Sequence, residues 1–154
     1  MKNLFLALVF CFLFCVSTFP QGPEKLDEFV SVSCDDYLAR MDYAMTKASD
    51  NAARIYFLIY EGKEFKYNNR KNISELVFPN RGSAEAKIRS MKEYIASRRF
   101  PVEQVTFLKA GFRENSTVEV WLVPNGITPP KPTPTLTKMK YRKGKASGFC
   151  TWCC

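Results

Sequence analysis

The sequence feature that most restricts the fold is an uninterrupted apolar run at residues 55–60, which reads IYFLIY. Every residue in it is β-branched, aromatic or leucine, and no charge divides the run. A run of this length and composition is typical of a strand that is covered on both faces. We therefore expect residues 55–60 to form a central strand of a sheet, with other parts of the chain packed on either side of it.

The segments before and after this run predict two amphipathic helices. Ser33 and Ser83 are expected to be their N-caps, because a serine hydroxyl accepts a hydrogen bond from an amide of the first turn. The apolar residues of the first helix recur with helical period at Tyr37, Leu38, Met41, Ala44, Met45 and Ala48. In the second helix one apolar stripe holds Ala84, Ile88, Met91 and Ile95, while Lys87, Arg89, Lys92 and Glu93 lie away from it.

Further strands are expected at residues 29–32, 105–108 and 118–122, with a turn at Gly111 before the last of them. Alternation along the last strand directs Val118, Val120 and Leu122 to the core and Glu119 to solvent. The expected element order is β-α-β-α-β-β. This order predicts an α+β fold, a two-layer α/β sandwich in which two helices pack on one face of a mixed sheet.

The segment at residues 61–79 is polar and contains Gly62, Asn68, Asn69 and Pro79 as breakers of regular structure. We expect it to form a long irregular loop. Loops of this length in compact domains are commonly functional or disordered.

The two ends of the chain differ in composition from its middle. Residues 4–19 carry no charge and follow Lys2, which predicts a signal peptide at residues 1–20 and export to the periplasm, to the cell envelope or to the medium. Retention of this segment as an uncleaved anchor is the open alternative. We expect one domain at residues 21–125, a proline-rich extended spacer at residues 126–137 and a basic, cysteine-containing tail at residues 138–154.

Net positive charge is concentrated after residue 125, where there are six basic residues and no acidic ones. Such a tail is expected to contact anionic surfaces, or simply to stay solvated, and no nucleic-acid partner is expected. These basic residues are Lys131, Lys138, Lys140, Arg142, Lys143 and Lys145.

The composition argues against an enzyme. The chain has no histidine, which removes the commonest general base and the commonest metal ligand. It also lacks a glycine-rich phosphate loop, and Glu103, Glu114 and Glu119 do not form an acid/base pair by their spacing. We therefore predict a non-enzymatic protein with no cofactor and no metal.

The exported chain would retain Cys34, Cys150, Cys153 and Cys154. An even number of cysteines in an oxidising compartment predicts disulfides, either one that ties the tail to Cys34 or an intermolecular one. Three complete pairings are possible. The C-x-x-C spacing of Cys150 and Cys153 leaves a thiol redox function open as an alternative.

The segment from Asn80 to Val120 resembles the OmpA-like domain, with which bacterial envelope proteins bind peptidoglycan. The similarity extends over residues 29–123 and rests on Asn80, the pair Tyr94-Ile95, the link 101–106, Gly111 and the triplet Val118-Glu119-Val120. The resemblance implies a cell-envelope protein whose ligand is peptidoglycan or another envelope component.

The same resemblance implies a clamp made of an Asp after the second strand and an Arg on the second helix. In this sequence Gly62 stands at the Asp position with Glu61 beside it, and Lys87 stands at the Arg position. Lysine keeps the charge but not the planar fork that binds a carboxylate with two hydrogen bonds. Two hypotheses follow. Either the fold has a different cell-wall binding site made of Glu61, Asn80, Arg81 and Lys87, or it no longer binds the cell wall. We favour the second.

The preferred function is therefore an exported, non-enzymatic envelope protein with a divergent OmpA-like domain in a structural or interaction role. One alternative is an accessory factor whose basic tail, tipped by cysteines, binds an anionic surface or a thiol partner. Another alternative is a thiol redox protein. The oligomeric state cannot be predicted from the sequence.

Overall fold

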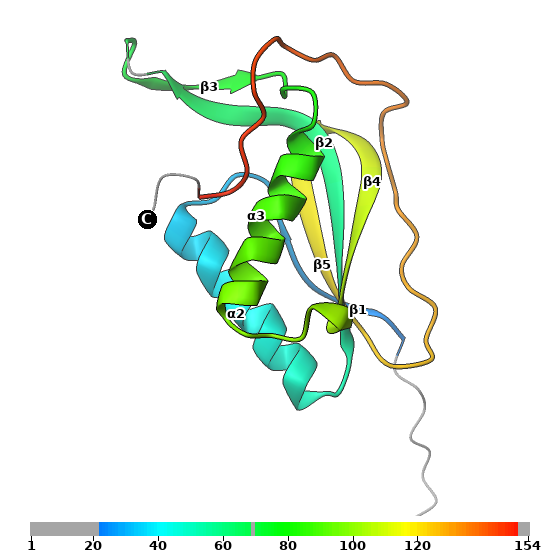
Figure 1. Ribbon diagram of the computed structural model, residues 1–154. Coiled ribbons are helices and arrows are strands. Elements are labelled where there is room, and N and C mark those ends of the chain that lie inside the picture. Colours follow the sequence, from blue (N-terminus) through cyan, green and yellow to red (C-terminus); the bar gives the residue numbers. More distant parts are fainter. Residues whose placement is uncertain (1–21, 69, 151–154) are drawn as a thin grey trace, which may run out of the picture.

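A computed structural model describes residues 22–68 and 70–150 of the chain. Its helices are α2 (Cys34–Asp50), α3 (Ser83–Ser97) and the short 3-10 helix η1 (Val102–Gln104). Its strands are β1 (Glu24–Phe29), β2 (Arg54–Asn68), β3 (Ile73–Val77), β4 (Val105–Asn115) and β5 (Thr117–Val123) (Figure 1). The α+β class is confirmed. All six expected elements occur in the expected order, and one further strand, β3, lies between the second strand and the second helix.

The sheet is mixed, as predicted. β1 pairs antiparallel with β5, β5 pairs antiparallel with β2, and β2 pairs parallel with β4. Ile55 is opposite Leu122 on one side and Val105 on the other, so residues 55–60 are central in the sheet as expected. The crossover from β2 to the parallel strand β4 contains α3, and the start of this helix contacts Glu61 and Glu64 of β2.

Residues 55–60 contribute to two separate clusters on the two faces of the sheet. Ile55, Phe57 and Ile59 belong to the main core, which also contains side chains of both helices and of β5. Leu58 and Tyr60 form the second cluster with Ala110. The expectation that this run is covered on both faces is therefore confirmed.

The first helix begins as predicted. The Ser33 hydroxyl accepts a hydrogen bond from the amide of Asp36, at 3.2 Å, and so caps α2. The buried residues of this helix are Tyr37, Met41, Ala44, Met45 and Ala48.

The second helix begins differently from the prediction. The N-cap of α3 is Gly82, with a φ of 85°, and Ser83 is the first helical residue. The Ser83 hydroxyl donates to Glu64 Oε1, at 2.6 Å, rather than capping the helix. A carboxylate of β2 takes the capping role, because Glu61 Oε1 accepts a hydrogen bond from the amide of Ala84, at 3.0 Å.

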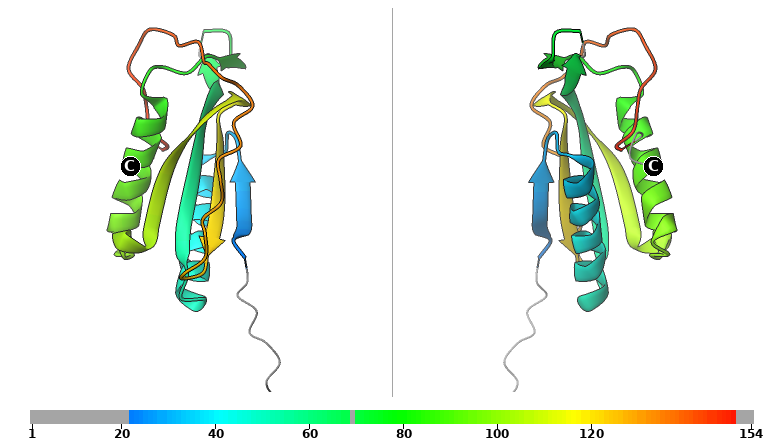
Figure 2. Two further views of the ribbon diagram at one scale, coloured as in Figure 1. Left: turned by 90° about the vertical axis from the view of Figure 1, so that its right-hand side faces the viewer. Right: turned by 90° about the vertical axis from the view of Figure 1, so that its left-hand side faces the viewer.

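The expectation of an irregular loop at residues 61–79 was wrong. β2 continues to Asn68 and forms an antiparallel hairpin with β3, in which Phe65 is opposite Leu76 and Tyr67 is opposite Ser74. This hairpin extends beyond the other strands (Figures 1 and 2). Its apolar residues are more exposed than those of the core, and Phe65 and Tyr67 are each 55% exposed.

The remaining strands also differ from the expected boundaries. β1 ends at Phe29, where the sequence led us to expect a strand to begin. β4 continues through Gly111 to Asn115, and the chain reverses at Ser116. Gly111 has a φ of 96°, and a β-carbon there would lie 2.9 Å from Pro134, so glycine is needed because the C-terminal segment passes close to β4.

The C-terminal segment, which we define as residues 126–150, lies along the domain. Figure 2 shows its first part and α2 on opposite sides of the sheet. The segment then joins β4, where the amides of Thr135 and Leu136 donate to Phe112 O, and it ends at α3, where the amide of Phe149 donates to Ser90 Oγ. Within residues 22–68 and 70–150, no helix combines the length and the apolar character needed to cross a membrane.

Candidate functional site

The residues at the predicted clamp lie where the middle of β2 meets the start of α3 and the C-terminal segment. Glu61, Asn80 and Lys87 are buried there, at 9%, 8% and 7% exposure. Arg81 is exposed, and its guanidinium carbon lies 5.8 Å from the ring centroid of Tyr141. The structure thus places all four residues around the same helix start, but each has its own partners.

Glu61 is engaged through both carboxylate oxygens. Oε1 accepts from the amide of Ala84, at 3.0 Å, and Oε2 accepts from the hydroxyl of Tyr141. Burial, followed by the hydrogen bond to Glu61 and the negative charge of Glu61, raises the pKa of Tyr141 to about 12. The tyrosine hydroxyl therefore keeps its proton and remains the donor to Glu61 at neutral pH.

Lys87 is not a solvated helix residue, which corrects the expectation that it lies away from the buried stripe. Its ammonium group forms an ion pair with Glu64, at 2.6 Å, and donates to Ser116 Oγ. It also lies 5.5 Å from the ring centroid of Phe149 in the C-terminal segment. Burial alone would raise the pKa of Glu64, but the charge of Lys87 and the hydrogen bonds from Lys87 and Ser83 outweigh it and lower this pKa.

A small cavity of about 160 Å³ adjoins Lys87. The C-terminal segment forms one side of it. The cavity is lined by Val30, Ser31, Val32, Lys63, Glu64, Phe65, Lys87, Ser116, Ser147, Gly148 and Phe149.

The contact between Lys87 and Ser116 has the residue types of a serine–lysine nucleophile pair. A base in such a pair needs a free lone pair on the amine, whereas an ammonium can only donate. Here the Lys87 nitrogen instead forms an ion pair with the Glu64 carboxylate, at 2.6 Å. The two contacts of Lys87 join α3 to β2 and to the β4–β5 turn.

Asn80 contacts the C-terminal segment directly. Its Nδ2 donates to the carbonyl of Lys145, at 2.6 Å, and its backbone forms a parallel bridge with Arg142. A β-carbon on Gly144 would lie 3.4 Å from both terminal atoms of the Asn80 side chain. The segment therefore passes close over Asn80.

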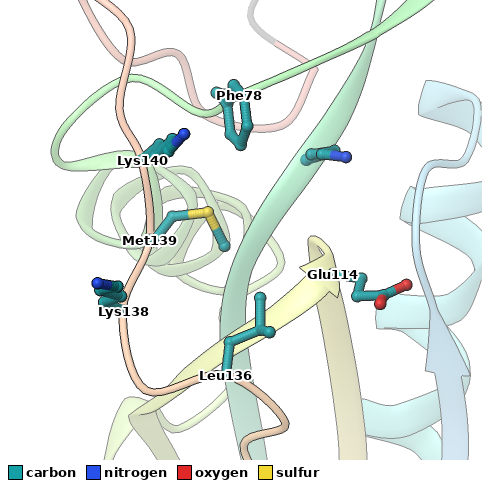
Figure 3. A pocket seen from close by; sticks show the side chains of 7 residues that line it. Phe78, Glu114, Leu136, Lys138, Met139 and Lys140 are labelled. Carbon is teal, nitrogen blue, oxygen red and sulfur yellow. The ribbon is translucent and has the colours of Figure 1, made fainter.

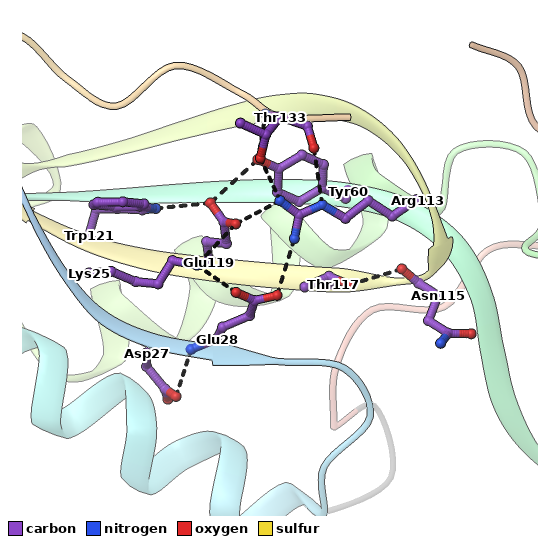
Figure 4. Close-up of polar contacts among 10 residues, drawn as sticks. All are labelled: Lys25, Asp27, Glu28, Tyr60, Arg113, Asn115, Thr117, Glu119, Trp121 and Thr133. Carbon is purple, nitrogen blue, oxygen red and sulfur yellow. Dashed lines mark hydrogen bonds and ion pairs between the residues drawn. The ribbon is translucent and has the colours of Figure 1, made fainter. Parts of the chain in front are cut away.

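A second polar cluster lies on the face of the sheet opposite the main core (Figure 4). We call it the Glu119 cluster, and it consists of Lys25, Tyr60, Arg113, Glu119, Trp121 and Thr133. Glu119 was expected to face solvent but is only 4% exposed. It accepts from Arg113 Nη2, at 2.7 Å, and from Trp121 Nε1, at 3.0 Å. Burial alone would raise the pKa of Glu119, but these two hydrogen bonds and the charges of Arg113 and Lys25 lower it.

The Glu119 cluster fixes the proline-rich part of the C-terminal segment. The Arg113 guanidinium carbon lies 3.6 Å from the ring centroid of Tyr60, and Arg113 Nη2 donates to Thr133 Oγ1, at 2.8 Å. The amide of Thr133 donates to the Tyr60 hydroxyl, at 3.0 Å. The alternation of β5 could have placed Glu119 and Trp121 on one face, but the pairing with Arg113 depends on strand contacts that the sequence pattern does not give.

Cys34 and Cys150 both lie close to Tyr37. Burial, followed by electrostatic interactions with Cys150, Tyr94 and Cys34, raises the pKa of the Tyr37 hydroxyl. The ring of Tyr37 stacks on that of Phe149, with 4.6 Å between the centroids. The end of the C-terminal segment is therefore brought to the start of α2. Cys153 and Cys154 lie outside the described residues, so the predicted disulfide stays a prediction.

Among the residues that the structure describes, no three or more His, Cys, Asp or Glu side chains gather in a way that could hold a metal ion. In comparisons with known proteins, no family model, no curated protein and no solved structure matches this chain. The resemblance to the OmpA-like domain therefore stays a prediction.

Proposed function

We propose that this chain is an exported, non-enzymatic envelope protein. Its divergent OmpA-like domain has a structural or interaction role and no longer binds peptidoglycan. The observation that carries the proposal is the occupation of the clamp region by the chain itself. Glu61 binds Tyr141, Asn80 binds the carbonyl of Lys145, and Lys87 pairs with Glu64.

The state of Lys87 supports the loss of wall binding. A stem-peptide carboxylate that reached Lys87 would have to replace Glu64 in a partly buried ion pair, and it would find an ammonium rather than a guanidinium fork. Removing one partner from a buried pair is strongly unfavourable, because the other charge is left without compensation. The exchange offers a wall fragment little net free energy.

The two buried acids at the clamp and on the opposite face support a non-enzymatic role. Glu61 holds the first turn of α3 and the C-terminal segment together, and Glu119 holds Arg113, Trp121 and Lys25. Carboxylates engaged in this way organise the structure, since both oxygens of each already accept hydrogen bonds from the chain.

The proposal is tested by sedimentation of the full chain with purified peptidoglycan sacculi. We expect the wild type and the Lys87→Ala variant to stay equally in the supernatant. Lys92→Ala is the matched control, because Lys92 is an exposed lysine on the same helix. Strong retention of the wild type and of Lys92→Ala, combined with loss of retention in Lys87→Ala, would show that the clamp still binds the wall.

A second candidate function is recruitment to an anionic surface through the C-terminal segment. It is favoured by the exposure of five of the six basic residues there, namely Lys131, Lys138, Lys140, Lys143 and Lys145. Binding of this kind should weaken steeply as ionic strength rises, because exposed charges are screened by salt. Retention on an anionic resin between low and physiological salt measures this dependence. A thiol partner and a thiol redox role remain alternatives at the terminal cysteines.

A further inference from the structure

The C-terminal segment forms an arch over the end of the sheet between residues 136 and 142. One end of the arch is fixed on β4, where the amide of Leu136 donates to Phe112 O, at 3.1 Å. The other end is fixed beside α3, where the amide of Arg142 donates to Pro79 O, at 3.0 Å. Because backbone hydrogen bonds hold both ends, the space under the arch exists without any ligand.

This space is a pocket of about 620 Å³, which we call the arch pocket. Its apolar lining comes from Phe78, Leu136 and Met139, and in Figure 3 these three side chains point toward one another across a common space. Phe78 lies directly after β3, and Leu136 and Met139 belong to the arch. Pockets of this size that combine apolar side chains with a few polar or charged groups are typical of small-molecule sites.

The charged groups around the arch pocket are mostly positive. Lys63, Lys138 and Lys140 line it together with one acid, Glu114, whose carboxylate points away from the apolar side chains in Figure 3. Lys138 and Lys140 are exposed, and the ammonium group of Lys63 lies 5.5 Å from the ring centroid of Phe78. The pocket thus combines an apolar interior with a cationic rim.

We propose that the arch pocket binds a single-chain amphiphile with an anionic head group, a carboxylate or a phosphate. The apolar chain lies under the arch against Phe78, Leu136 and Met139, and the head group pairs with Lys138 and Lys140. A purely apolar ligand would leave the lysines unused, and a small anion would leave the apolar interior exposed to water. This inference is independent of the proposed loss of peptidoglycan binding.

The test is a calorimetric titration of the full chain with laurate below its critical micelle concentration, at about 0.15 M ionic strength, where distant exposed charges are screened. We expect saturable binding of one laurate per chain, and weaker binding of dodecanol, which has the same chain without the charge. In the double variant Lys138→Glu/Lys140→Glu the affinity should fall about tenfold or more, since two attractive charges become repulsive.

The matched control is Lys131→Glu/Lys143→Glu, which makes the same change at exposed lysines of the same segment that do not line the pocket. Its affinity for laurate should stay within about twofold of the wild type, because exposed charges at a distance are screened. Met139→Glu places a charge in the apolar interior and should abolish binding, while circular dichroism checks that it is folded.

Three outcomes would overturn the proposal. The first is the absence of saturable heat with laurate. The second is an equal loss of affinity in both double variants, which would reduce the effect to the net charge of the segment. The third is binding to vesicles that contain phosphatidylglycerol without binding to monomeric laurate, which would assign the lysines to a membrane surface.

Discussion

The two faces of the central strand β2 are stabilised in different ways. Ile55, Phe57 and Ile59 join a continuous apolar core with side chains of both helices. On the other face Tyr60 is covered by the C-terminal segment through the polar contacts of the Glu119 cluster. One face therefore depends on apolar burial, whereas the cover of the other face depends on charges and hydrogen bonds. The two faces should respond differently to mutation and to pH.

The largest effect is expected on the apolar face. Phe57 is fully buried and stacks on Phe107, with 5.4 Å between the ring centroids. Phe57→Ala should lower the free energy of unfolding by about 3–5 kcal/mol, measured by urea denaturation. In the control Phe65→Ala, an exposed hairpin phenylalanine is removed, and the change should stay within about 0.5 kcal/mol. Equal losses in both variants would refute the distinction between the core and the hairpin.

A smaller effect is expected on the polar face. Glu119→Gln removes the negative charge that faces Arg113 and Lys25 and should lower the free energy of unfolding by about 1–3 kcal/mol. It should also speed proteolysis at the proline-rich part of the C-terminal segment, since Thr133 is held by the same cluster. The control Glu93→Gln changes an exposed acid on α3. Unchanged proteolysis in Glu119→Gln would mean that the cluster does not hold the segment.

The pKa of three described carboxyls is lowered, namely Glu64, Glu85 and Glu119. Because Glu85 is exposed, the pH dependence should follow mainly Glu64 and Glu119. The folded protein then binds fewer protons than the unfolded chain, so their stabilising contribution is present above the unfolded pKa of about 4.3. It is lost as the pH falls through the lower folded pKa. We expect thermal stability to decline in this acidic window, and the decline to be shallower in Glu64→Gln. An identical profile for the variant and the wild type would contradict this assignment.

The smallest effect is expected at Asn80. Asn80→Ala removes the hydrogen bond to the carbonyl of Lys145 and should cost about 0.5–1.5 kcal/mol. The loss should be local, with faster amide exchange at Arg142 and unchanged exchange in β2. A change in β2 of the same size would show that the segment and the sheet unfold together.

Periodicity and composition predicted the elements whose pattern is local. Residues 55–60 and the stripes of both helices were readable because burial imposes a period of two or of 3.6 on the sequence. β3 and the second half of β2 were missed because polar and apolar residues alternate along exposed strands. Lys66 follows Phe65 in β2, and Glu75 precedes Leu76 in β3, so the segment resembles a polar loop. The hairpin has no buried face, so burial imposes no recognisable apolar pattern on its sequence.

The location of the candidate site was predictable from the sequence, but the partners of its residues were not. The resemblance directed attention to Glu61, Asn80 and Lys87, which the structure does place around the start of α3. Their partners were not predictable, because the contact between Glu61 and Tyr141 joins residues 80 positions apart. The expectation that Glu119 faces solvent was wrong, because a remote segment of the chain covers that face of the sheet.

Amide hydrogen exchange of the C-terminal segment, measured by NMR, tests most directly whether the chain covers its own clamp region. The account predicts slow exchange at Thr135, Arg142 and Phe149, whose amides donate to Phe112 O, Pro79 O and Ser90 Oγ. Exchange of all three at the rates of an unstructured peptide would contradict it, because the segment would then leave Glu61, Asn80 and Lys87 open to a ligand.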